Sequence, residues 1–269
     1  MAAKKPRVPS IITLLTDFGT RDAYVASMKG VILGLNPQVR LVDLSHAVPP
    51  QDVRAGAFLL AAAAPYFPAQ TIHLAVVDPG VGTPRRALAA RCRGQYWVGP
   101  DNGLFHLIFI GATDLTRVSL ENPAYFRPTV SATFQGRDLF APVAAHLSLG
   151  VSLEQLGPPL TDPVTLPLPL PTFTPAAVHG EVIYVDHFGN LVTNLKMAEI
   201  KAWLAGESFS LHLGALTFKR LSRTYGEAGP GEFLALEGSH GYLEVACNQD
   251  NAARRLGAGL GLVVEIRRT

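Results

Sequence analysis

A proline-rich stretch beyond the middle of the chain constrains the fold more than any other sequence feature. Residues 163–175 read PVTLPLPLPTFTP, with five prolines and no charged side chain. Each proline restricts φ and removes a backbone donor, so the segment cannot continue a helix or form a central strand, and its composition is typical of a semi-rigid extended linker. We therefore predict two domains, residues 1–162 and 177–269, joined by a linker over 163–176.

Strands alternate with helices in the predicted first domain. Apolar runs predict strands at 11–16, 39–44, 71–77, 87–92 and 95–98. Helical periodicity predicts helices over 22–35, 52–64, 102–110 and 138–149. This alternation indicates an α/β domain whose mainly parallel sheet is covered on both faces.

Short alternating runs fill the predicted second domain. They predict strands at 181–185, 191–195, 209–213, 233–236, 242–246 and 262–266. Turn residues separate most of these runs, a pattern typical of a smaller all-β domain that forms a barrel or a sandwich.

Composition excludes several classes of protein. Hydrophobic residues make up 48% and charged residues 16%, which favours a packed core over disorder. The net charge is +2 with no long basic stripe, so we expect no nucleic-acid partner. The longest apolar stretch, 57–65, is too short to span a membrane, and the apolar run at 11–15 is too short for a signal peptide. We interpret Cys92 and Cys247 as free thiols of a cytoplasmic protein rather than a disulfide.

Two acidic residues directly follow predicted strands of the first domain. In an open α/β sheet, ligands bind beyond the carboxyl ends of the strands. Asp17 follows 11–16 and either binds a ligand or caps the next helix. Asp78 follows 71–77 and opens the loop DPGVGTPRR, whose two glycines admit close backbone approach. Arg85 lies seven residues on, where it either braces this loop through a salt bridge or helps Asp78 hold a polar reactant.

Three further polar segments have both a structural and a functional interpretation. TFQGRD at 133–138 is a helix start or part of a site, and DHFGN at 186–190 and SHGYLE at 239–244 are turns between strands or ligand contacts. Phe188 and Tyr225 either stack on a base or pack in the core. The eight histidines show no metal-ligand spacing and no Gly-x-Ser-x-Gly motif is present, so we expect neither a metal site nor a serine hydrolase.

Taken in order, these segments resemble one known family, the S-adenosylmethionine (SAM) hydroxide adenosyltransferases, which are adenosine-forming SAM hydrolases related to the SAM-dependent fluorinases and chlorinases. Each motif is weak alone, but the ordered set covers nearly the whole chain. It comprises TDFG at 16–19, VDPGVGT at 77–83, PDNGL at 100–104, FQGRD at 134–138, DHFGN at 186–190 and SHGYL at 239–243.

The resemblance implies an N-terminal α/β domain, a C-terminal β-barrel and a homotrimer, with SAM bound between the N-terminal domain of one subunit and the C-terminal domain of its neighbour. It also implies roles for individual residues. By matching position, Asp17 would bind the ribose hydroxyls. Adenine would be contacted by Asn190 and by the backbone near Gln249, with Phe188 and Tyr225 beside the base. The methionine amine and carboxylate would be held by Asp186 and Ser239.

The reaction implied by the resemblance is attack of water or hydroxide on C5′ of the SAM ribose, with methionine leaving from the sulfonium. The sulfonium already makes C5′ electrophilic, so no metal and no cofactor are expected, and the protein must hold the nucleophile in line with the C5′–S bond. Asp78 and Arg85 match two members of the family's Asp-Arg-His triad. The third position is Gln135, which can hold a water molecule but cannot titrate as a general base.

Two other functions stay open at this stage. Gln135 would suit a SAM- or adenosine-binding protein with little or no catalysis. A SAM-dependent halogenase is the second alternative, although the halogenases carry Tyr where this chain has Asp78. A carboxylate at that position would repel a halide that must lose its hydration shell in the same pocket.

Overall fold

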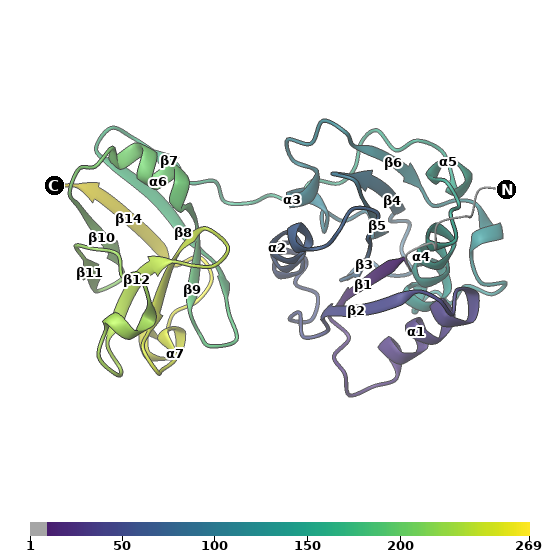
Figure 1. Cartoon of the computed structure of the whole chain (residues 1–269), viewed down its shortest axis with the longest axis horizontal. Coiled ribbons are helices and arrows are strands. Elements are labelled where there is room, and N and C mark those ends of the chain that lie inside the picture. Colours follow the sequence, from purple (N-terminus) through teal and green to yellow (C-terminus); the bar gives the residue numbers. More distant parts are fainter. Residues whose placement is uncertain (1–9) are drawn as a thin grey trace, which may run out of the picture. The chain divides into compact units, whose positions relative to one another are not determined.

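The computed structural model describes residues 10–269 and divides between Leu166 and Pro167 into two compact units. We call them unit 1 and unit 2. Unit 1 is an α/β domain and unit 2 is an all-β domain with two short helices (Figure 1). The predicted fold class is therefore confirmed.

Unit 1 contains a mixed sheet with helices on both faces. Its strands are β1 (Ile11–Thr16), β2 (Arg40–Ser45), β3 (Ile72–Val76), β4 (Ala87–Cys92), β5 (Gln95–Pro100) and β6 (Thr116–Ser119). Its helices are α1 (Tyr24–Leu35), α2 (Val53–Ala63), α3 (His106–Phe109), α4 (Ala141–Ser148) and α5 (Leu153–Leu156), and its shorter turns are η1 (Ala64–Tyr66), η2 (Pro123–Tyr125) and the π-helical η3 (Gly136–Phe140).

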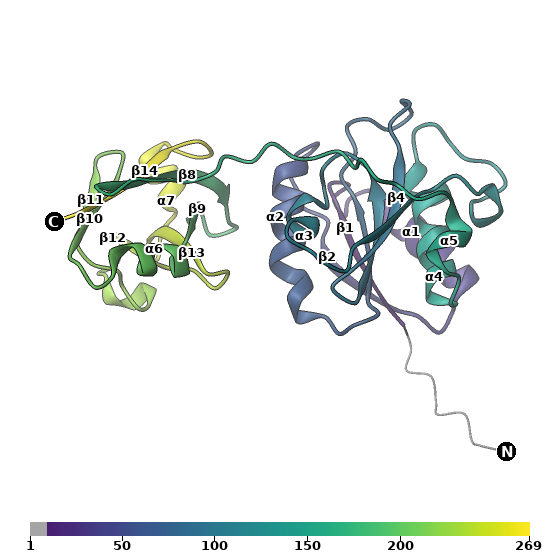
Figure 2. The same cartoon turned by 90° about the horizontal axis from the view of Figure 1, so that it is seen from above.

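The strand order of this sheet is β2-β1-β3-β5-β4-β6. The first four strands are parallel, whereas β4 runs antiparallel to both of its neighbours. Figure 2 shows α2 and α3 on one face and α1, α4 and α5 on the other. Because both faces are covered, the central strand β3 is buried along its whole length.

Unit 2 is built on one antiparallel, barrel-like sheet with the strand order β11-β10-β14-β8-β9-β13-β12, and β7 pairs with β8. Its strands are β7 (Thr172–Phe173), β8 (Ala177–Val185), β9 (Leu191–Lys196), β10 (Phe209–Leu213), β11 (Leu216–Phe218), β12 (Phe233–Glu237), β13 (Tyr242–Cys247) and β14 (Val263–Arg268). The helical segments are α6 (Met197–Leu204), α7 (Ala252–Leu256) and the single turn η4 (Tyr225–Glu227).

The proline-rich segment is hydrogen-bonded at both of its ends. Val164 N donates to Asp101 Oδ1 of unit 1 at 2.9 Å. Within unit 2, the Asn194 side chain donates to Pro169 O and the Trp203 indole donates to Thr174 O, each at 2.9 Å. The linker limits of 163 and 176 stay a prediction.

The prediction of a helix over 102–110 was largely wrong. Only His106–Phe109 is helical. Asn102 instead forms a side-chain turn, because its Oδ1 accepts from Leu104 N at 3.2 Å and its Nδ2 donates to Val77 O at 2.8 Å. An Asn side chain that competes for local backbone groups in this way opposes helix formation. Within residues 10–269, no helix is both long and apolar enough to cross a bilayer.

A buried histidine makes the stability of unit 1 depend on pH. His73 in β3 is fully buried, stacks on Trp97 and lies 2.8 Å from Thr13 Oγ1 through Nδ1. Burial lowers the pKa of His73 from 6.5 to about 4. The neutral ring is therefore favoured in the folded state, whereas the unfolded chain takes up a proton near pH 6.5.

We predict that the stability contributed by the neutral form of His73 is complete above about pH 6.5 and is lost as the pH falls from 6.5 towards 4. Urea unfolding monitored by Trp97 fluorescence at several pH values measures it, and His73→Leu removes the titration. The difference in unfolding free energy between the two proteins should change across this range. Parallel pH profiles would contradict the assignment.

Candidate functional site

Two acidic residues leave the sheet of unit 1 at the same edge. The parallel strands β1 and β3 are neighbours, and Thr16 at the end of β1 pairs with Val76 at the end of β3. Asp17 and Asp78 follow these two positions, so they lie at the carboxyl edge of the sheet, where open α/β folds bind ligands.

Asp78 and Arg85 form a fork-like ion pair. Arg85 Nε lies 2.9 Å from both carboxylate oxygens of Asp78, and Arg85 Nη2 donates to Asp78 Oδ2. The side chains are only 5% and 12% exposed, respectively. A charged pair so well shielded from water interacts much more strongly than a surface pair. The loop 78–86 therefore closes on itself and presents a fixed carboxylate.

Gln135 completes a three-residue cluster with this pair. Arg85 Nη2 also donates to Gln135 Oε1 at 2.5 Å. Because a guanidinium has no acceptor, the amide oxygen must face Arg85, and this leaves the Gln135 NH₂ group to donate elsewhere. Arg85 additionally lies over the ring of Phe140, 5.4 Å from its centroid.

A close backbone approach brings the Asp78 loop to the Gln135 segment. Gly82 has φ +79°, and a Cβ placed on it would lie 2.7 Å from Ala132 O. Any side chain at this position would push the two segments apart. Gln135 itself precedes the π-helical turn η3, a wider turn often found at functional sites.

A relay of side chains braces the loop that carries Asp17. Thr16 Oγ1 accepts from Phe18 N at 3.2 Å and lies 2.8 Å from His46 Nδ1. His46 Nε2 lies 3.0 Å from Asp43 Oδ1, and Lys29 donates to Asp43 Oδ2 at 2.6 Å. Burial opposes the charge of Asp43, but Lys29 and His46 outweigh this effect and lower the pKa of Asp43.

Asp17 is partly exposed and is positioned by a main-chain contact. Its Oδ2 accepts from Gln51 N at 2.8 Å, and Gln51 has a left-handed φ of 66°. Asp17 therefore does not cap the following helix, and its other carboxylate oxygen is available to a ligand. Sequence inspection missed the Thr16–His46–Asp43 relay, because Thr16 is 30 residues from His46 along the chain.

All six residues predicted to bind substrate in unit 2 line one pocket of about 680 Å³. They are Asp186, Phe188, Asn190, Tyr225, Ser239 and Gln249. Phe188 is 72% exposed and Tyr225 is 44% exposed, so neither is a core residue. Exposed aromatic rings at a pocket are suited to stacking on a flat ligand.

Asp186 holds the turn that shapes this pocket. Its Oδ1 accepts from Phe188 N at 2.9 Å and from Asn190 N at 2.8 Å. Its Oδ2 accepts from the side-chain amide of Asn190 at 2.8 Å. The Asn190 amide oxygen remains as the group that can face a ligand.

The structure adds Glu244 to the same pocket. Glu244 is 4% exposed, and its Oε1 accepts from the Tyr225 hydroxyl at 2.8 Å. Burial and the nearby Asp186 raise the pKa of Glu244, although the Tyr225 hydrogen bond opposes this effect. The SHGYLE segment, with its two open interpretations, already included Glu244, but the sequence pattern does not reveal the direction of this side chain.

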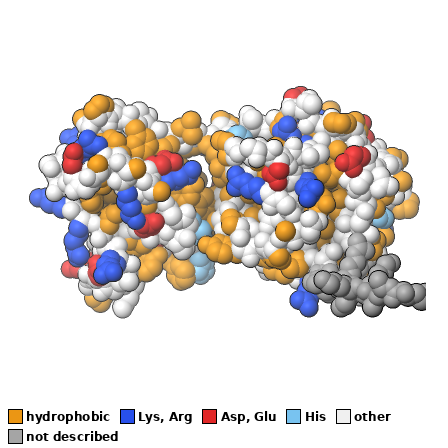
Figure 3. Space-filling view, turned by 45° about the horizontal axis from the view of Figure 1, so that its top comes forward, with side chains coloured by type: hydrophobic (Ala, Val, Ile, Leu, Met, Phe, Trp, Pro, Cys, Tyr) orange, Lys and Arg blue, Asp and Glu red, His pale blue; other side chains and the backbone are white. Residues whose placement is uncertain are grey.

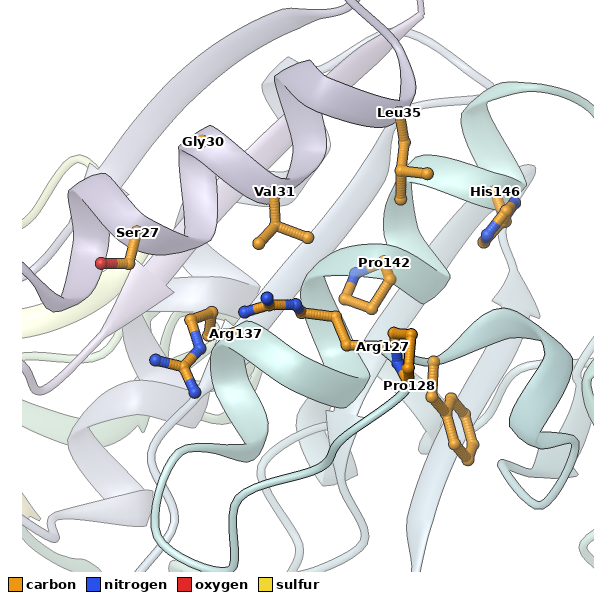
Figure 4. A pocket seen from close by; sticks show the side chains of 10 residues that line it. Ser27, Gly30, Val31, Leu35, Arg127, Pro128, Arg137, Pro142 and His146 are labelled. Carbon is orange, nitrogen blue, oxygen red and sulfur yellow. The ribbon is translucent and has the colours of Figure 1, made fainter.

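A separate hollow of about 530 Å³ lies between α1, α4 and η3 (Figure 4). Arg127 and Arg137 both border this hollow, and both donate to the fully buried carboxylate of Asp138. His146 also lines this hollow, and burial lowers the pKa of its imidazole. The charged groups here are largely paired with one another, so this hollow has a structural explanation.

Within residues 10–269, no three His, Cys, Asp or Glu side chains gather as a metal-binding group. On the face drawn in Figure 3, the Lys and Arg side chains are scattered among acidic and apolar ones. The structure therefore holds two candidate ligand sites, which are the Asp78–Arg85–Gln135 cluster with Asp17 in unit 1 and the acidic pocket in unit 2.

Comparison with protein families matches both units. Residues 12–157 match the SAM hydroxide adenosyltransferase N-terminal domain, and residues 180–265 match the C-terminal domain of the same family. Together these matches cover well over half of the chain.

Individual proteins of known sequence are similar over most of their length. An (R)-S-adenosyl-L-methionine hydrolase of Salinispora tropica is 43% identical over 93% of this chain and 95% of its own. An (R)-S-adenosyl-L-methionine hydrolase of Thermus thermophilus is 42% identical over 95% of this chain and 98% of its own. A fluorinase of an Actinoplanes species is more distant, with 30% identity over 95% of this chain and 97% of its own.

A crystal structure of an uncharacterized conserved protein from Thermotoga maritima is also similar. It has a TM-score of 0.89 and 36% identity, and the match covers 96% of this chain and 100% of that chain.

The relay behind Asp17 predicts the effect of a near-isosteric substitution. Thr16→Val removes the hydroxyl and leaves Phe18 N and His46 Nδ1 without it. We predict that this lowers the free energy of unfolding of unit 1 by about 1–3 kcal/mol, as measured by urea unfolding. The exposed Thr129→Val is the control and should change it by less than about 0.5 kcal/mol. Equal effects of the two substitutions would show that the relay is unimportant for stability.

Proposed function

The chain belongs to the SAM hydroxide adenosyltransferase family, and on this premise we propose that the Asp78–Arg85–Gln135 cluster holds the nucleophile of its reaction. The chain is an adenosine-forming SAM hydrolase, which converts SAM to adenosine and L-methionine. The observation that carries the proposal is the shielded contact of Asp78 and Gln135 with one guanidinium, at the sheet edge where ligands bind.

In the proposed mechanism, Asp78 orients a water molecule and accepts its proton while the water oxygen attacks C5′. The C5′–S bond breaks, and the electron pair of that bond neutralises the sulfonium as methionine leaves. Arg85 stabilises the hydroxide character that develops on the oxygen. Because the leaving group is a neutral thioether, it needs no proton, and the residues have only to activate and align the nucleophile.

Gln135 acts as a positioning residue in this mechanism. Its oxygen accepts from Arg85, so its NH₂ group is the part that can donate to the water oxygen. A donor there aligns the water but cannot take its proton. Asp78 is therefore the sole proton acceptor of the cluster.

We assign the proposed substrate contacts to unit 1 and unit 2 in turn. We propose that Asp17 binds the ribose hydroxyls and that the pocket of unit 2 binds the remainder of SAM. There Asn190 and the backbone near Gln249 contact adenine, Phe188 and Tyr225 lie beside the base, and Asp186 and Ser239 hold the methionine amine and carboxylate. The support is the matching motif positions, together with the presence of all six unit 2 residues in one pocket.

We further propose a cytoplasmic homotrimer in which unit 1 of one subunit and unit 2 of its neighbour share each substrate. The support is the family resemblance, and both cysteines are buried free thiols in this structure. SAM is the substrate, and the proposed mechanism uses no cofactor.

The fluorinase relative makes halide the alternative nucleophile to consider. The shielded carboxylate of Asp78 disfavours it, because a desolvated halide beside this group would be repelled. Incubation with SAM and chloride should therefore yield adenosine without 5′-chloro-5′-deoxyadenosine, as measured by chromatography.

Asp78→Asn tests the assignment of the proton acceptor. An amide cannot accept the proton, so we predict a fall in kcat of about 10²- to 10⁴-fold, with adenosine formation from SAM as the measurement. Asp114→Asn is the matched control, because Asp114 contacts Arg93 in the β4–β5 turn at the opposite edge of the sheet. An unchanged rate in Asp78→Asn would overturn the mechanism, and SAM binding without turnover in the wild type would favour a binding protein.

Gln135→His tests the positioning role. The imidazole supplies a second base, so we predict an increase in kcat of about 10-fold and a new decline in rate below about pH 6.5, where the ring becomes protonated. Gln135→Leu, which removes the acceptor of Arg85, should lower kcat instead. A Gln135→His enzyme with the wild-type rate and pH profile would show that this side chain does not reach the nucleophile.

A further inference from the structure

The motif PDNGL at 100–104 has no role in the proposed mechanism, yet it contacts the loop on which that mechanism depends. The motif begins at the last residue of β5, whose parallel pairing with β3 ends at Leu74 and Val98. Because Pro100 has no N–H group, it cannot extend this pairing as a donor. The next two residues of the motif instead reach the two ends of the loop 78–86.

Asn102 holds the first end of this loop. Its Nδ2 donates to Val77 O at 2.8 Å, while its Oδ1 accepts from Leu104 N at 3.2 Å. The carbonyl of Val77 belongs to the same planar peptide unit as the N–H of Asp78, so the orientation of this plane affects the direction in which the Asp78 side chain leaves the backbone. Asn102 therefore constrains the carboxylate through the peptide that precedes it.

Asp101 holds the second end of the loop. Its N–H donates to Arg86 O at 3.0 Å, and its Oδ2 accepts from Arg86 Nε at 2.9 Å. The Asp101 side chain is 1% exposed, so this charged contact is well shielded from solvent. Arg86 directly follows Arg85, and the two contacts therefore restrict the backbone that carries the guanidinium of the cluster.

The ends of the loop matter because its middle is exposed. Residues 81–84 are open to solvent. Within the loop, Val81 N donates to Asp78 O at 3.2 Å and Thr83 N donates to Gly80 O at 3.1 Å. These short-range bonds shape the turns but do not attach the loop to the sheet. A displacement of about 1 Å at a reacting group can lower a rate by about 10²-fold, so the attachment at the ends bears on catalysis.

We propose that Asn102 and Asp101 are positioning residues of the hydrolysis reaction, which clasp the two ends of the loop 78–86 and hold the carboxylate and the guanidinium of the cluster in line for the nucleophile. The inference rests on the proposed function of that cluster. Asn102 is the better residue to test, because Asp101 Oδ1 also accepts from Val164 N at the start of the linker.

Asn102→Asp is the decisive substitution. It keeps the size of the side chain and the acceptor for Leu104 N, but it places an acceptor where a donor faces Val77 O. We expect kcat for adenosine formation to fall about 10- to 100-fold. The KM for SAM and the calorimetric Kd of the unreactive analogue S-adenosylhomocysteine should change by less than about 3-fold, because the substitution leaves Asp17 and the pocket of unit 2 in place.

Asn122→Asp is the matched control, because Asn122 makes the same two kinds of contact elsewhere. Its Oδ1 accepts from Ala124 N at 3.1 Å, and its Nδ2 donates to Gln155 O at 2.7 Å, which joins η2 to α5. Urea unfolding should therefore show a similar loss of stability in the two variants. Only Asn102→Asp should lose kcat.

A double variant separates positioning from a general structural role. If Asn102 acts through Asp78, its substitution should change the residual rate of the Asp78→Asn protein by less than about 3-fold, because the proton acceptor that it positions is already absent. A residue that only supports the fold would lower the rate by the same factor in both backgrounds.

The second end of the loop provides an independent test, which also serves if Asn102→Asp fails to fold. Arg86→Gln weakens the contact with Asp101 and should lower kcat about 3- to 10-fold with little change in KM. Arg86 also donates to the exposed Asp162 at 2.8 Å. Asp162→Ala removes only this outer partner and should leave kcat unchanged.

Three results would overturn the proposal. They are an equal loss of kcat in Asn102→Asp and Asn122→Asp, weaker binding of S-adenosylhomocysteine with kcat unchanged, and a full effect of Asn102→Asp in the Asp78→Asn background. The proposed function fails in a different way, since it requires Asp78→Asn itself to be slow. A slow Asp78→Asn enzyme beside an unimpaired Asn102→Asp enzyme would contradict the clasp alone.

Discussion

The contact of one guanidinium with Asp78 and Gln135 is the constraint on which the site of unit 1 depends. Arg85 has donors on two sides, and it joins a loop that follows β3 to the turn that begins α4. The bond also dictates which end of the Gln135 amide faces the cluster, because guanidinium offers only donors. The polarity of the site therefore follows from a single side chain and from the Gly82 approach that brings its two partners together.

The polar cluster of unit 1 and the pocket of unit 2 differ in their electrostatics. In unit 1 the acid is neutralised by Arg85, so the cluster can hold a neutral water without a large excess of charge. In unit 2, Asp186 and Glu244 line a pocket whose described lining includes no Lys or Arg, so the pocket is suited to a cation. Hydrolysis removes the sulfonium charge, which would weaken attraction of the products to the acidic pocket.

Much of the fold was predictable because it depends on local patterns. The strands from β1 to β5 and the helices α1 and α2 follow apolar runs and helical periodicity closely. The errors occur where side chains override these patterns. Asn102 forms its own turn and shortens the next helix, and α6 was missed between two strand-like runs. The π-helical turn after Gln135 has no distinct sequence signal either.

By itself, the sequence determined the class of each domain, the chemical groups available and, through six ordered motifs, the family. These properties depend on residue type and order along the chain. Only the tertiary structure decided which groups meet. It placed Gln135 against Arg85 across 50 residues, joined Thr16 to His46 and Asp43, and directed Glu244 into the pocket with Tyr225. Such contacts depend on strand order and on the direction of each side chain, which hydrophobic periodicity does not encode.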